Sequence, residues 1–81
     1  MKRQELIEFH EKELEKYDSL AKTELESVRK MLVDLALYIE EEGYLNEYRL
    51  EKTMDRIKEY KNYKKQAGIT QSILSNLNMV E

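Results

Sequence analysis

The chain contains no proline and only two glycines, Gly43 and Gly68, in 81 residues. Because proline and glycine are the residues that most strongly interrupt helices, long unbroken helices can form on either side of each glycine. A content of 38% charged residues is also typical of long, solvent-exposed helices. We therefore expect an all-α fold in a single domain, residues 1–81.

Apolar residues between Leu6 and Ile39 follow the alternating three- and four-residue steps of a coiled coil. The strictest part of this seam consists of Ala21, Leu25, Val28, Leu32, Leu35 and Ile39. Upstream, the pattern continues less strictly through Ile7, Leu14 and Tyr17. From Met31 to Ile39 apolar residues occupy nearly every face, so we expect more than one neighbour to cover this segment.

Local signals divide the chain into a long helical hairpin and a short third helix. Gly43 is placed to end a first helix of about residues 4–42, and Asn46 is placed to cap a second helix of about residues 47–67. The residues expected on its inner face are Leu50, Met54, Ile57, Tyr60 and Ala67. Gly68 then ends this helix, and Thr70 caps a C-terminal helix of about residues 71–79. The predicted architecture is coiled-coil-like.

The two long helices expected from these signals differ in length. At about 1.5 Å per residue, a helix of about 40 residues is about 60 Å long, whereas one of about 21 residues is about 32 Å long. Either the first helix breaks near Asp18 and Ser19, whose side chains are good caps, or its N-terminal half projects and pairs with another chain. Of these alternatives we favour an antiparallel homodimer.

The chain lacks the residues on which most catalytic and metal sites are built. It has one histidine, His10, and no cysteine, so it offers no Ser/His/Asp or Cys/His set and no second imidazole for a metal. Neither glycine belongs to a glycine-rich phosphate loop. We therefore predict no enzymatic activity, no cofactor, no metal and no small-molecule substrate.

Membrane insertion and secretion are not expected either. No run of about 18 apolar residues exists, and the N-terminal residues 1–5 lack the apolar segment and cleavage site of a secretory signal. The expected location is therefore the cytoplasm, without membrane contact.

The net charge of -3 is unevenly distributed along the chain. Residues 1–51 carry 8 Lys/Arg and 14 Asp/Glu, whereas residues 52–81 carry 6 and 3. The acidic run at residues 40–42 lies at the carbonyl end of a helix, where negative charge opposes the helix dipole. Either Arg49 and Lys52 of the returning helix offset this run, or it binds a basic partner. The candidate partner-binding residues are Glu40, Glu41, Glu42, Ile7, Leu14 and Tyr17.

A group of lysines on the second helix weakly indicates nucleic-acid binding. The group comprises Lys58, Lys61, Lys64 and Lys65, with Tyr60 and Tyr63 between them. Lysines can contact phosphates and tyrosine rings can stack on bases. A solvated lysine face with half-buried tyrosines fits the pattern at least as well, so both interpretations stay open.

Residues 63–77 resemble the helix-turn-helix of bacterial repressors of the LacI family. Ala67-Gly68-Ile69-Thr70 matches the family's Ala-Gly-Val-Ser turn, Leu74 and Leu77 fall on its buried positions, and Ser75 keeps its place. The resemblance implies contacts to DNA phosphates and bases. The residues that it assigns to these contacts are Thr70, Gln71, Ser72 and Asn76.

These features together predict a small non-enzymatic regulatory or inhibitory module of phage or mobile-element origin. It would bind a protein partner through helix faces, which need no catalytic residues. Two alternatives stay open. The chain is a DNA-binding transcriptional regulator that uses its C-terminal motif, or it is a structural or assembly subunit of a phage.

Overall fold

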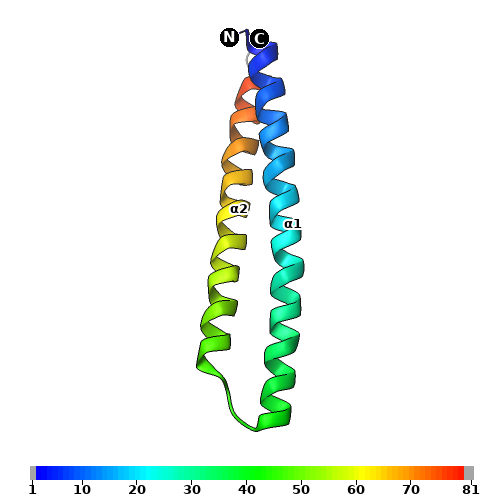
Figure 1. Ribbon diagram of the computed structural model, residues 1–81. Helices are drawn as coiled ribbons and strands as arrows, with labels where there is room; N and C mark the ends of the chain where they lie inside the picture. Colours follow the sequence, from blue (N-terminus) through cyan, green and yellow to red (C-terminus); the bar gives the residue numbers. More distant parts are fainter. Residues whose placement is uncertain (1, 80–81) are drawn as a thin grey trace.

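The computed structural model describes residues 2–79, which form two long helices joined by a short turn (Figure 1). Helix α1 spans Arg3–Glu42 and helix α2 spans Glu47–Met79. The two helices run antiparallel and side by side, so the start of α1, in blue, lies beside the end of α2, in red. The hairpin is 61 Å long and 17 by 14 Å across. The predicted all-α hairpin is therefore confirmed.

The turn forms with the caps that the sequence indicates. Gly43 adopts a left-handed φ of 77°, and its N–H donates to the carbonyl oxygen of Ile39 at 2.8 Å. This backbone conformation favours glycine because it crowds a Cβ atom. At the start of α2, the side-chain Oδ1 of Asn46 accepts a hydrogen bond from the N–H of Arg49 at 3.1 Å. Both expected caps are confirmed.

The helices meet along one seam with a seven-residue repeat. The buried residues of α1 are Ile7, Ala21, Val28 and Leu35, and half-buried Leu14 completes the series. The buried residues of α2 are Thr53, Ala67, Thr70 and Leu74. Many of these side chains are small, which allows the two helix axes to approach closely. The buried hydroxyl of Thr53 donates to the carbonyl oxygen of Arg49 at 2.8 Å, so it is satisfied within its own helix.

The second half of the predicted seam is wrong by about one residue. Glu24, Met31 and Tyr38 are half-buried, whereas Leu32 and Ile39 are exposed. On α2, Thr53 is 2% exposed and Met54 is 50% exposed, so Met54 does not face inward as expected. A single neighbouring helix covers only one side of the broad apolar arc of α1, and the other side stays uncovered.

Helix α2 does not end at Gly68, which corrects the prediction of a separate third helix. Residues 71–79 are helical, but they continue α2, and Gly68 lacks the positive φ that Gly43 shows. Glycine inside a helix costs about 1 kcal/mol relative to alanine. Burial of Ala67, Thr70 and Leu74 against α1 offsets that cost. Thr70 is accordingly a buried residue within the helix and not an N-cap.

The added length of α2 removes the expected mismatch between the helices. With 33 residues, α2 is about 50 Å long and covers α1 almost to its first turn. There, Nε and Nη2 of Arg3 donate to the carbonyl oxygen of Leu77 at 3.0 and 2.7 Å. Helix α1 neither breaks near Asp18 nor projects beyond its partner helix. The expected break and the expected projection are both wrong, because each assumed that the second helix stopped at residue 67. The homodimer itself stays a prediction.

Candidate interaction surface near the turn

The apolar residues that the seam leaves uncovered lie mainly in the half of the hairpin nearest the turn. Leu32 is 46% exposed, Met54 is 50% exposed and Ile39 is also exposed. On α1, positions 25, 32 and 39 share one face, and on α2 so do positions 50, 54 and 57. We call this set the apolar strip. It consists of the exposed residues Leu32, Ile39 and Met54 and the half-buried residues Leu25, Leu50 and Ile57.

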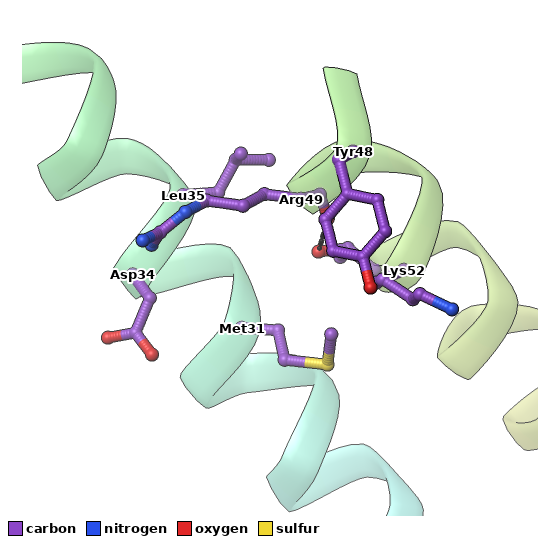
Figure 2. A pocket seen from close by; sticks show the side chains of 7 residues that line it. Met31, Asp34, Leu35, Tyr48, Arg49 and Lys52 are labelled. Atoms are coloured by element: carbon purple, nitrogen blue, oxygen red, sulfur yellow. Dashed lines mark hydrogen bonds between the residues drawn. The ribbon is translucent and has the colours of Figure 1, made fainter. Parts of the chain in front are cut away.

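A shallow depression between the two helices shows on which side of the hairpin the apolar strip lies, because the strip is on the side opposite to it. Asp34 of α1 and Lys52 of α2 both line this depression (Figure 2). Side chains two positions apart in a helix are separated by about 200° around its axis. Leu32 therefore lies opposite Asp34, and Met54 lies opposite Lys52. Both helices therefore contribute their part of the strip to the same side of the hairpin.

The depression itself is small. Its volume is about 150 Å³, below the roughly 300–1,000 Å³ of an ordinary ligand cavity. Asp34 and Lys52 point to opposite sides of it, and within residues 2–79 they form no ion pair (Figure 2). It is a gap between side chains rather than a pocket of ligand size.

Two further apolar residues lie on the outward face of α1. Val33 is 58% exposed and Leu37 is 48% exposed, and their four-residue spacing places them side by side. Exposed Lys30 and Glu41 flank them on the same face. We call Val33 and Leu37 the outer pair.

The turn is held by a cluster of tyrosines and one arginine. The hydroxyl oxygens of Tyr38 and Tyr44 lie 2.8 Å apart, and the Arg49 guanidinium lies 4.4 Å from the centre of the Tyr38 ring. The hydrogen bond between the hydroxyls lowers the pKa of Tyr38 and raises the pKa of Tyr44. The cluster fixes the turn, and its exposure provides no enclosed site for chemistry.

The six predicted partner-binding residues lie in two different environments. Residues 40–42 are exposed, and within residues 2–79 no ion pair joins them to Arg49 or Lys52. Instead, Arg49 contacts Tyr38, and Lys52 Nζ lies 5.3 Å from the centre of the Tyr48 ring. Ile7 is buried and Leu14 and Tyr17 are half-buried, so α2 already covers these three side chains.

Most of the residues predicted to bind nucleic acid are exposed, but not all of them. Lys58, Lys61, Lys64 and Lys65 are exposed, while Tyr60 and Tyr63 are half-buried. Gln71, Ser72 and Asn76 are exposed, but Thr70 is buried. Because Ala67 to Thr70 are helical, the two crossing helices of a helix-turn-helix do not form in this segment.

Residues 2–79 carry neither a cluster of metal-ligating side chains nor a membrane-spanning stretch. His10 is half-buried, with its ring 5.2 Å from that of Phe9, and no cluster in this range brings together three His, Asp or Glu side chains for a metal ion. Over the same range, neither helix has an apolar stretch long enough to cross a membrane.

Comparison with known proteins provides no relative. No family model, no curated protein and no solved structure matches the chain. The class is therefore defined by the fold alone. It is an antiparallel α-helical hairpin whose apolar surface near the turn is incompletely covered.

Proposed function

We propose that the chain is a small non-enzymatic, cytoplasmic interaction module that binds protein partners through the outward face of α1 near the turn. One observation carries this proposal. The outer pair, Val33 and Leu37, is about half-exposed although it lies in the most apolar segment of the chain. Contiguous exposed apolar residues bordered by charges are characteristic of interaction sites.

The surroundings of the outer pair indicate which partner it fits. Val33 and Leu37 present the i, i+4 spacing with which an amphipathic helix enters an apolar groove. The acidic residues 40–42 follow directly and remain exposed, so a groove with a basic rim would complement this end of α1. Occupying such a groove on a host or phage protein would make the chain a regulator or inhibitor.

A capture experiment with matched variants tests this proposal. The full chain, the double variant Val33→Lys/Leu37→Lys and the control Thr23→Lys are immobilised and exposed to nuclease-treated low-GC bacterial lysate. Thr23 is an exposed polar residue of α1 outside the outer pair. We expect specific proteins bound by the wild type and by the control to be lost from the double variant. An identical set of captured proteins from all three chains would refute the role of the outer pair.

DNA binding is the second candidate, supported by the exposed lysines of α2. Lys58, Lys61, Lys64 and Lys65 form no ion pair within residues 2–79. Binding of this kind would be to phosphates, without the base contacts of a helix-turn-helix. Binding to random duplex at about 50 mM salt that weakens steeply by about 200 mM would support it, whereas no binding at the lower salt would exclude it.

A further inference from the structure

The hairpin exposes more surface than a compact protein of its mass. Its accessible surface is 6469 Å², whereas a compact monomer of 9.8 kDa exposes about 5,200 Å². The difference of about 1,300 Å² exceeds the roughly 800 Å² that each partner buries in a standard protein interface. The elongated shape of the hairpin produces this excess, which leaves room for an interface of standard size, and the exposed residues of the apolar strip are part of that surface.

Charged residues of opposite sign flank the two ends of the apolar strip. On α2, Glu47 lies on the side toward the turn, seven residues before Met54, and Lys58 lies on the side away from the turn, four residues after Met54. Both are exposed, and their spacing places them on the same side of the hairpin as the strip. On α1, Lys22 and Asp18 precede Leu25 by three and seven residues, so their charges offset each other. The α2 part of this face is thus acidic toward the turn and basic away from it.

A two-fold axis across the hairpin would bring opposite charges together. On α2, the point midway between Glu47 and Lys58 falls between Lys52 and Thr53. Met31, which directly precedes Leu32 of the strip, lines the same depression as Lys52 and Thr53. An axis at that level therefore pairs Glu47 with Lys58 and passes near Leu32.

We propose that the apolar strip is covered by a second copy of this chain, in an antiparallel two-fold dimer that forms a four-helix bundle. Leu32 and Met54 lie near the axis and pack against the partner's strip. Glu47 then faces Lys58 of the partner subunit. A parallel dimer would instead place Glu47 of both copies at the same end, where like charges repel.

The dimer uses a face different from that of the outer pair, so its failure and the failure of the proposed function are distinguishable. Leu32 and Met54 carry the dimer, whereas Val33 and Leu37 carry binding to another protein. A monomer whose outer pair still captures partners would refute only the dimer. A dimer that captures no protein through the outer pair would refute only the proposed function.

Sedimentation equilibrium of the full chain, from about 10 to 500 µM, tests the association. We expect a reversible transition from the monomer mass of 9.8 kDa to twice that mass. Leu32→Asp should weaken the dimer by about 100-fold, because it buries an unpaired charge twice. The control is Ile69→Asp, since Ile69 is likewise 46% exposed but lies outside the strip, and it should leave the dissociation constant unchanged.

Three outcomes of that experiment would overturn the proposal. They are a monomer at every concentration, equal weakening by the two aspartate variants, and growth beyond the dimer, which would indicate an open assembly subunit. Circular dichroism of each variant establishes that its helices are retained.

Charge reversal tests the antiparallel arrangement without altering the apolar strip. Lys58→Glu alone and Glu47→Lys alone should each weaken the dimer by about tenfold, since each places like charges together twice. The double variant Glu47→Lys/Lys58→Glu should regain the wild-type dissociation constant. A double variant weaker than both single variants would overturn the antiparallel two-fold.

Discussion

The two glycines have opposite roles, although each is followed within three residues by a side chain that can cap a helix, Asn46 or Thr70. Gly43 has a φ of 77° and ends α1, whereas Gly68 lies inside α2. A Cβ atom added at Gly68 would meet nothing within 4 Å outside its own helix backbone. Position 68 therefore tolerates a side chain, while at position 43 the backbone conformation itself opposes one.

Alanine at the two positions should change stability in opposite directions. Gly68→Ala should raise the free energy of unfolding by about 0.5–1 kcal/mol, because alanine is the better helix former. Gly43→Ala should lower it by about 1 kcal/mol, because the left-handed conformation strains an alanine. Urea unfolding followed by circular dichroism at one protein concentration measures both changes. A destabilised Gly68→Ala would instead support the helix break that the sequence suggests at residue 68.

At the scale of single residues, the helix caps could be predicted from the sequence. Which of two neighbouring residues is buried in the seam could not. Gly43 and Asn46 are recognised because one residue type fits each backbone position. At the seam, hydrophobicity favours Met54 over Thr53, yet Thr53 is the buried residue. Its hydroxyl is satisfied by Arg49 within the same helix, so only the contact with α1 decides between them.

At the scale of elements, α1 was predicted to within one residue, whereas the end of α2 was misplaced by about 12 residues. The apolar repeat of α1 runs along the whole helix, less strictly upstream of Ala21, and contains no glycine or proline. In α2, the local Gly68–Thr70 signal imitates a helix stop followed by a cap. Burial of Thr70 and Leu74 against α1 overrides it, and a local pattern does not reveal such long-range contacts.

Close helix packing at Ala21 predicts sensitivity to side-chain size. Ala21 is 3% exposed, so Ala21→Leu should lower the free energy of unfolding by about 1–3 kcal/mol through overpacking. The control Thr23→Leu adds an apolar side chain at an exposed position of the same helix and should change stability by less than about 0.5 kcal/mol. Thermal unfolding monitored by circular dichroism compares them. Equal stability of the two variants would mean that the helices are not in close contact at Ala21.

At the scale of the whole molecule, a two-helix hairpin has one seam and no enclosed core. The sequence indicated that residues 31–39 need more than one neighbour, and the structure supplies only α2. The breadth of this apolar arc could thus be predicted from periodicity, but the sequence pattern placed the free apolar side chains at Ile7, Leu14 and Tyr17, which α2 covers. The division of the uncovered surface into the apolar strip and the outer pair could not be predicted, because that depends on which side of α1 the returning helix covers.

The central claim about the whole molecule is that a second copy of the chain covers the apolar strip near the turn. It is tested most directly by following each amide and methyl signal of the full chain by NMR from about 10 µM to 1 mM, a range that spans micromolar association. We predict concentration-dependent shifts at Leu25, Leu32, Ile39 and Met54, with none at Leu20 or Ile69. Unchanged signals across the strip, or shifts centred on Leu20 and Ile69, would contradict the account.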